Sequence, residues 1–357
     1  MPKKLVLCLD GTNNQYKKDN TNVVKLLAML DKSAADQLVY YQPGIGTRLP
    51  PGVYGRLRTW LLTRADLAFA SLLKHQVQDA YRFLMRYFED GDEVYIFGFS
   101  RGAYTARVLA GMLHKVGLLA KGNEEMIPFA WDAYRPLRNF ELAHGFRNTF
   151  GRKLNVRFLG LWDTVSSVRW AGREVSLPHT QSNPGVMMVR HAIAIDERRA
   201  YFRQNLWDAT PPAGQDVREV WFAGVHCDVG GGYLESESGL SKIALRWMVV
   251  QVQSLLAFHG PSVERMLPVA SGPSCSAPSA TATMHESLQG WWRVVEWLPR
   301  RWKNPAKNFS PSWILPLGRR RWMPAGACVH SSVVERMNGG PGGGYTPPLP
   351  PNFRIEP

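Results

Sequence analysis

Apolar and polar residues alternate along the chain in a strand-helix-strand rhythm that begins at the N-terminus. The apolar run at residues 4–9 (KLVLCL) predicts a buried strand, and apolar residues with helical spacing follow it over 22–31. Residues 37–42 predict a second strand, and residues 75–88 predict an amphipathic helix. This alternation is typical of an α/β fold, in which helices flank a mostly parallel central sheet.

The same rhythm continues to about residue 258 and then stops. Three further strands and three further helices are predicted before that point: strands at 94–98, 156–162 and 219–225, and helices after residue 101, at 185–195 and at 240–258. In open parallel sheets, ligands bind at the edge formed by the carboxyl ends of the strands. The residues that directly follow each predicted strand are therefore the first candidates for chemistry.

One strand-to-helix junction contains a recognisable catalytic motif. Residues 98–102 read Gly-Phe-Ser-Arg-Gly, which matches the G-x-S-x-G nucleophile elbow, with a predicted strand before it and a predicted helix after it. Ser100 would occupy a strained backbone position, and the two glycines, which have no Cβ, would let strand and helix approach closely. The alternative is that Ser100 caps the helix between glycines that serve only packing.

A serine nucleophile needs a base within hydrogen-bond reach and a carboxylate that orients the base. Hydrolases with this elbow present the three in the chain order Ser, acid, His, each after a strand. Asp163 follows the predicted strand at 156–162, and His226 follows the one at 219–225. We therefore predict Ser100 as the nucleophile, Asp163 as the acid and His226 as the base.

Each assignment has a competing interpretation. Asp163 is alternatively a turn-forming or helix-capping aspartate, and His226 a histidine packed at the sheet edge. His330, near the C-terminus, is the alternative base, although no clear strand precedes it.

The loop after the first strand is the second candidate region. We expect an oxyanion hole built from the backbone amide of Arg101 and an amide of Gly11 or Thr12, with Asp10 anchoring that loop. Asp10 and Asp228 are alternatively cation ligands, but two lone carboxylates on separate loops are weak indications of a metal site. We expect neither a metal nor a cofactor.

Composition and charge narrow the possible partners. The 357 residues are 45% hydrophobic and 20% charged, as in a globular protein, and the net charge of +14 indicates attraction to polyanions. No nucleic-acid-binding motif occurs, so we do not expect nucleic acid as a partner. The N-terminus turns polar too early for a secretory signal, and no apolar run is long enough to span a membrane. We expect synthesis in the cytoplasm, with any export using a signal-independent secretion system.

The last third of the chain has a different composition. Residues 268–284 are of low complexity, and residues 291–322 hold six of the thirteen tryptophans, interleaved with arginine and lysine. Tryptophan and cationic residues together suit a membrane interface, but they equally suit packing on the rest of the protein. We predict a catalytic domain at 1–265 and, at 266–357, a linker with a Trp/Arg-rich segment that either packs on this domain or contacts a membrane.

Six ordered motifs resemble the α/β-hydrolase catalytic domain of the type VI secretion phospholipase effectors. The resemblance covers roughly residues 3–258, and the motifs read LCLDGTNN, YQPGIGT, GDEVYIFGFSRGAYTARVLAGML, FLGLWDTV, RHAIAIDERRAYF and WFAGVHCDVGGGY. The resemblance implies an α/β-hydrolase-like fold and a serine esterase acting on phospholipid acyl chains, with Ser100, Asp163 and His226 in the roles given above. The characterised effectors are usually longer and have appended membrane-targeting regions.

The leading functional prediction is a phospholipase of A type that forms an acyl-enzyme on Ser100, which water then attacks with His226 as base. The second prediction keeps the same residues but replaces the lipid with a soluble or polymeric ester. The third is a degenerate hydrolase fold that serves as a binding or toxin-associated module. The expected partners are phospholipid or another ester, a membrane surface contacted peripherally, and a secretion-apparatus or immunity protein.

Overall fold

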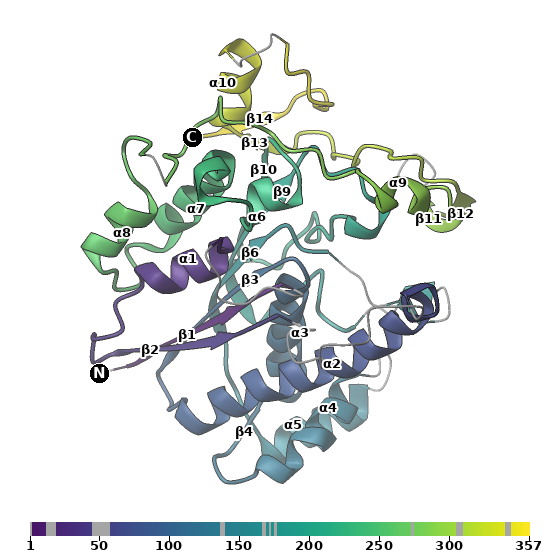
Figure 1. Ribbon diagram of the computed structural model, residues 1–357. Coiled ribbons are helices and arrows are strands. Elements are labelled where there is room, and N and C mark those ends of the chain that lie inside the picture. Colours follow the sequence, from purple (N-terminus) through teal and green to yellow (C-terminus); the bar gives the residue numbers. More distant parts are fainter. Residues whose placement is uncertain are drawn as a thin grey trace.

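The centre of the molecule is a parallel sheet of eight strands. The computed structural model describes residues 2–11, 19–44, 58–135, 140–165, 169–170, 173–174, 177–272, 275–304, 310–339 and 344–357. The strand order is β14-β13-β10-β9-β6-β3-β1-β2, and every neighbouring pair is parallel (Figure 1). The predicted α/β fold, a mostly parallel sheet flanked by helices, is confirmed.

The elements have the following bounds. The sheet contains β1 (Lys4–Leu9), β2 (Gln37–Gln42), β3 (Glu93–Phe99), β6 (Val156–Trp162), β9 (Val186–Ala194), β10 (Asp216–Phe222), β13 (Cys328–His330) and β14 (Arg354–Glu356). Three small antiparallel pairs join β4 (Leu118–Leu119) to β5 (Gly151–Arg152), β7 (Arg169–Trp170) to β8 (Arg173–Glu174), and β11 (Arg300–Asn304) to β12 (Ser310–Ile314).

The α-helices are α1 (Asn22–Met29), α2 (Arg58–Tyr87), α3 (Arg101–Val116), α4 (Ile127–Tyr134), α5 (Phe140–Phe150), α6 (His226–Gly230), α7 (Gly239–Val252), α8 (Gly260–Met266), α9 (Trp291–Val295) and α10 (Ser331–Gly339). Short 3₁₀ turns occur at η1 (Glu124–Met126), η2 (Ala200–Phe202) and η3 (Glu235–Glu237). Within the ranges described, no helix is both long enough and apolar enough to cross a bilayer.

Helices cover both faces of the sheet because successive side chains of a strand point to opposite faces. Along β1, Leu5, Leu7 and Leu9 pack into one core with α2, α3, α4 and α5, whereas Val6 and Cys8 pack into a second core with α1 and α7. Figure 1 shows α2, α4 and α5 on one side of the sheet and α1, α7 and α8 on the other. Strands buried on both faces explain the continuous apolar runs in the sequence.

The C-terminal segment, which we define as residues 266–357, contributes to the same sheet as the rest of the chain. Strand β13 pairs with β10, and β14 forms the outer edge (Figure 1). A third core joins Ile193 and Trp221 of the sheet to Met323 and Val329 of this segment. The residues on both sides of the predicted boundary near residue 265 therefore contribute strands to one sheet. The division into two units stays a prediction. Residues 305–309 and the side chains of residues 300–312 lie outside the described part.

Two predictions of secondary structure are wrong. Residues 185–195, predicted as a helix, form strand β9, and His330, for which no preceding strand was expected, ends strand β13. The error at β9 has a physical reason. Val189 packs on one face of the sheet and Ala192 on the other, so the strand lacks the apolar-polar alternation of a half-buried strand.

Some boundaries also differ from the predictions. Strand β10 ends at Phe222, three residues before the predicted end, because residues 223–225 form the turn into α6. Helix α7 ends at Val252 rather than near residue 258, and α2 begins well before residue 75.

Two glycines of the elbow permit close contact between β1, β3 and α3. A Cβ at Gly102 would lie 2.3 Å from the carbonyl oxygen of Leu9 and 2.5 Å from that of Asp10, and a Cβ at Gly98 would lie 2.6 Å from the carbonyl oxygen of Gly102. These neighbours are backbone atoms, which cannot rotate aside as a side chain can. The predicted close approach of strand and helix is confirmed.

We predict that Gly102→Ala lowers the free energy of unfolding by roughly 1–3 kcal/mol, because the added methyl group forces β1 and α3 apart. Urea unfolding followed by tryptophan fluorescence measures the change. Gly145→Ala is the matched control, since Gly145 lies within α5 with no atom within 4 Å of the added Cβ. It should raise stability by about 0.5–1 kcal/mol. Equal behaviour of the two variants would contradict the prediction.

Candidate active site

Ser100 lies at the sharp turn between β3 and α3. Its backbone has φ 59° and ψ −121°, a conformation rare for residues other than glycine. The turn is held from both sides, because the Ser100 N–H donates to the carbonyl of Trp162 at 3.0 Å and the Ser100 carbonyl accepts from Tyr104 N at 3.3 Å. The Ser100 side chain makes no capping hydrogen bond to α3.

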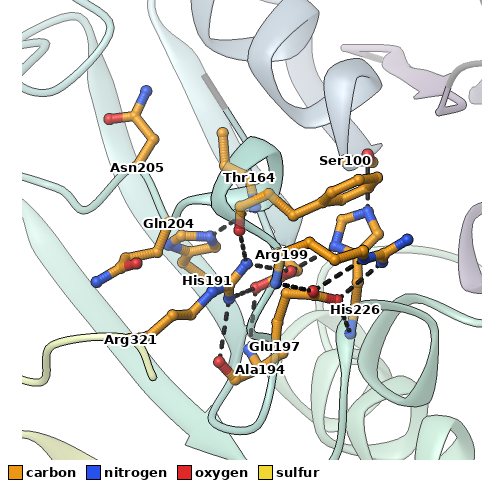
Figure 2. A network of polar contacts seen from close by, with 12 residues as sticks. Ser100, Thr164, His191, Ala194, Glu197, Arg199, Gln204, Asn205, His226 and Arg321 are labelled. Atoms are coloured by element: carbon orange, nitrogen blue, oxygen red, sulfur yellow. Dashed lines mark hydrogen bonds and ion pairs between the residues drawn. The ribbon is translucent and has the colours of Figure 1, made fainter. Parts of the chain in front are cut away.

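The Ser100 hydroxyl points at a histidine. His226 is the first residue of α6, and its Nε2 lies 2.8 Å from Ser100 Oγ (Figure 2). The other ring nitrogen, Nδ1, is hydrogen-bonded to Oδ2 of Asp163. The structure thus brings together in one row the three residues predicted from the sequence.

Asp163 directly follows β6, where its backbone also has positive φ, at 41°. The carboxylate is fully buried. Its Oδ1 accepts a hydrogen bond from Ala194 N at 3.0 Å, and its own N–H donates to Ala192 O at 2.7 Å. These bonds to β9 fix the acid between two adjacent strands of the sheet.

An arginine from the C-terminal segment contacts the same carboxylate. Arg321 donates from Nη1 to Oδ1 of Asp163 and from Nη2 to Oδ2 at 3.0 Å. Burial alone would raise the pKa of Asp163, but the positive charge of Arg321 and the hydrogen bond to His226 hold this pKa below its ordinary range. Asp163 is therefore ionised at neutral pH.

Two aromatic rings pack against the imidazole of His226. The ring of Phe99 lies 4.6 Å from the imidazole centre and that of Phe202 lies 4.9 Å from it. Burial lowers the pKa of His226, and its interaction with Asp163 opposes this effect only in part. The imidazole is therefore neutral at pH 7 and able to accept a proton.

A second buried carboxylate supports the backbone of His226. Glu197 accepts from His226 N at 3.2 Å, from Ser287 Oγ at 3.0 Å, and from Arg199 at 2.8 and 2.9 Å. Neither Glu197 nor Arg321 was predicted from the sequence as a site residue. Glu197 lies within the quoted RHAIAIDERRAYF motif, but Arg321 belongs to an arginine run in which its two neighbours are exposed, so no local pattern distinguishes it.

The loop after β1 is organised by Asp10. The Asp10 carboxylate accepts from Thr21 Oγ1 at 3.0 and 3.1 Å, from the Tyr41 hydroxyl at 3.1 Å, and from Gly11 N at 2.7 Å. Asp10 therefore anchors its loop, as expected. The Gly11 amide, a predicted oxyanion donor, is directed at this carboxylate, and Thr12 lies outside the described residues.

Asp228 has a different set of partners. Its Oδ2 accepts from Val225 N at 3.1 Å, and its Oδ1 lies 2.6 Å from Nδ1 of His285, so that Asp228 fixes the start of α6. Asp10 and Asp228 each bond to their own neighbours. Across the residues that the structure describes, no group of three or more His, Cys, Asp or Glu side chains is arranged to hold a metal ion.

The alternative base, His330, has another environment. Its Nδ1 lies 2.8 Å from Ser332 Oγ, and its ring stacks on Phe222 at 4.8 Å. Burial lowers the pKa of His330 to about 4. The histidine hydrogen-bonded to Ser100 is His226.

The sequence of this chain is similar to that of a known protein family. Residues 3–251 match the family model described as the catalytic domain of Tle1-like phospholipase effectors of the type VI secretion system. An uncharacterised protein of Saccharomyces cerevisiae is 40% identical over 227 residues, which are 58% of this chain and 33% of that protein.

Two solved structures are more distantly similar. An uncharacterised protein from Pseudomonas aeruginosa shares 20% identity at a TM-score of 0.43, covering 75% of this chain and 48% of the other. The Tle1 effector bound to the VgrG spike of the type VI secretion system shares 18% identity at a TM-score of 0.37, covering 75% and 62%. The chain thus spans less than two thirds of the length of each of these relatives.

The family model covers well over half of the chain, and its matched region contains Ser100, Asp163 and His226. The chain therefore belongs to the family of Tle1-like catalytic domains of type VI secretion phospholipase effectors.

Proposed function

We propose that this protein is a serine-dependent carboxylic ester hydrolase of phospholipase A type. The observation that supports it most directly is the 2.8 Å contact between Ser100 Oγ and His226 Nε2, in a row that ends on the ionised Asp163. Membership in a family of phospholipase effectors supports an ester of lipid as the substrate.

In the proposed mechanism, neutral His226 takes the hydroxyl proton as Ser100 Oγ attacks the ester carbonyl, and Asp163 stabilises the imidazolium that forms. The alcohol leaves with that proton, and an acyl group stays on Ser100. His226 then activates water, which releases the fatty acid. Asp163 remains ionised throughout.

The negative oxygen of the tetrahedral intermediate needs nearby donors. The Arg101 N–H is the first of α3, at the end of a helix where backbone amides point outward and the dipole favours an anion. We assign it as one donor. The Gly11 amide serves as the second only if its 2.7 Å bond to Asp10 opens.

Several exposed aromatic residues support a lipid surface as the place of action. Trp291, Trp297 and Trp313 of the C-terminal segment are 54%, 66% and 68% exposed. Tryptophan settles at the headgroup level of a bilayer, and the net charge of +14 attracts anionic lipid. Because of these tryptophans and this charge, peripheral membrane contact is part of the proposal. Family membership adds a secretion apparatus as the partner in export. An immunity protein stays a prediction.

We predict that the protein releases free fatty acid and lysolipid from mixed phospholipid vesicles and that Ser100→Ala releases neither. Residual activity of the variant should be lower by at least about 10⁴-fold, because the acyl-enzyme has no site on which to form. Mass spectrometry of the lipid products measures this and shows which acyl bond is cut.

The same experiment separates the alternatives. Labelling of Ser100 by a fluorophosphonate probe without any lipid product would favour a soluble or polymeric ester as the substrate. A protein that neither labels nor cleaves lipid would favour a binding module.

The choice of base can be tested with a pair of histidine variants. His226→Gln should lower the rate of fluorophosphonate labelling by about 10³-fold or more, since the neutral imidazole is the proton acceptor. His330→Gln should label within a few-fold of the wild type, because His330 is bonded to Ser332 instead. The reverse ranking would assign the base to His330.

The pH dependence follows from the direction of the pKa shifts. His226 acts as a base only when neutral, and burial lowers its pKa below the usual 6.5. The hydrolytic activity of the protein should therefore be retained at pH 6.5. It should be lost only as the pH falls through the lowered pKa of His226. The profile of kcat/KM on a short soluble ester, from about pH 4 to 9, measures this. An acid limb above pH 7 would contradict it.

A further inference from the structure

Arg321 is a buried arginine on the C-terminal segment, between β12 and β13. It is 7% exposed, whereas its neighbours Arg319 and Arg320 are exposed. Its Nη1 also donates to the carbonyl of Ala194 at 3.0 Å, and its Nη2 donates to the carbonyl of Phe202. The guanidinium is thus held by the last residue of β9 and by η2 at the same time as it contacts Asp163.

The contact with Asp163 has a specific geometry. Two nitrogens of the Arg321 guanidinium donate to the two oxygens of the Asp163 carboxylate. This paired contact fixes the plane of the carboxylate, whereas a point charge such as an ammonium would leave the carboxylate able to rotate. Oδ1 is bonded to Ala194 N and Arg321, which leaves Oδ2 directed at Nδ1 of His226. The orientation of the imidazole toward Ser100 therefore depends on Arg321 through Asp163.

We propose that Arg321 is a positioning residue for the row of Ser100, His226 and Asp163, so that the C-terminal segment completes the active site. This inference rests on the proposed function. Arg321 lies outside residues 3–251, the part that matches the family model. In that matched part, Asp163 is a fully buried carboxylate, and ionising such a group without a counter-charge is strongly unfavourable.

Other residues of the C-terminal segment support the elements next to His226. Ser287 bonds to Glu197, which accepts from the His226 amide, and His285 bonds to Asp228 at the start of α6. Glu296 is buried and links η2 to the connection between β12 and β13. It accepts from Ala200 N at 2.7 Å and from Gly318 N at 3.1 Å. The C-terminal segment thus contacts the surroundings of His226 through several residues besides Arg321.

The charges around the row determine how the loss of Arg321 would act. His226 is influenced by Asp163, Glu197 and Arg199, and Asp163 by Arg321, His226 and His191. Without Arg321, the charge of the buried Asp163 would be balanced by protonation of His226, so the imidazolium would be stabilised more strongly. The protonated form of His226 would then persist to higher pH, and the acid limb of the reaction would move upward.

The test is the second-order rate at which a fluorophosphonate probe labels Ser100 in the full-length protein, measured across pH. Wild type is compared with Arg321→Ala, Arg321→Lys and the matched control Arg319→Ala, which removes an exposed arginine of the same run. Ser100→Ala gives the background. The probe requires only an activated serine, so the experiment does not depend on the identity of the natural ester.

We expect Arg321→Ala to label about 10- to 100-fold more slowly at neutral pH, with its acid limb raised by about one pH unit. Arg319→Ala should match the wild type. Arg321→Lys should recover the pH profile but only part of the rate, because an ammonium supplies the charge without the planar fork. Low millimolar guanidinium should accelerate Arg321→Ala and leave Arg319→Ala unchanged.

Labelling of wild type and Arg321→Ala at equal rates and with equal pH profiles would overturn the inference, whereas absence of labelling in the wild type would overturn the proposed function instead. If Arg321→Ala does not fold, as judged by circular dichroism, Arg321→Lys and the double variant Arg321→Lys with Asp163→Asn decide the question. An effect of Arg321→Lys that persists in the Asp163→Asn background shows that Arg321 does not act through Asp163.

Discussion

The structure depends on one close approach of backbones. Strand β1, strand β3 and helix α3 meet at Gly98 and Gly102, where any side chain would overlap main-chain atoms. This contact confines the turn between β3 and α3, so that Ser100 keeps a positive φ at a cost of about 1–3 kcal/mol, which hydrogen bonds to neighbouring strands offset. The serine side chain is thereby pointed out of the sheet and toward α6.

Parallel strands explain why three residues so far apart in sequence meet. Each of Ser100, Asp163 and His226 comes shortly after a strand, and β3, β6, β9 and β10 are consecutive neighbours in the sheet. The carboxyl ends of parallel strands lie at one edge, so a strand pattern read from the sequence was sufficient to predict this meeting. The role of the elbow glycines was also predictable, because it follows from the local turn between strand and helix.

The support around these residues was not predictable from local patterns. Arg321 and Glu197 act through contacts with residues more than twenty positions away, and neither has a spacing that a strand or helix period would reveal. Strand β9 was misjudged because burial on both faces removes the alternation that identifies a strand. Local sequence thus determines where the candidate nucleophile and base lie, whereas tertiary packing determines their electrostatic surroundings.

The distance along the chain between Ser100 and Arg321 affects how the protein matures on the ribosome. The sequence places the arginine more than 200 residues after the serine. At about 5–20 residues per second, translation of the intervening chain takes roughly 10–40 s. For roughly the last 5–20 s of that interval, after residue 226 has been added, the nascent polypeptide contains Ser100, Asp163 and His226, but Asp163 lacks its cationic neighbour. Synthesis order therefore separates the appearance of these three residues from the assembly of their complete charge network.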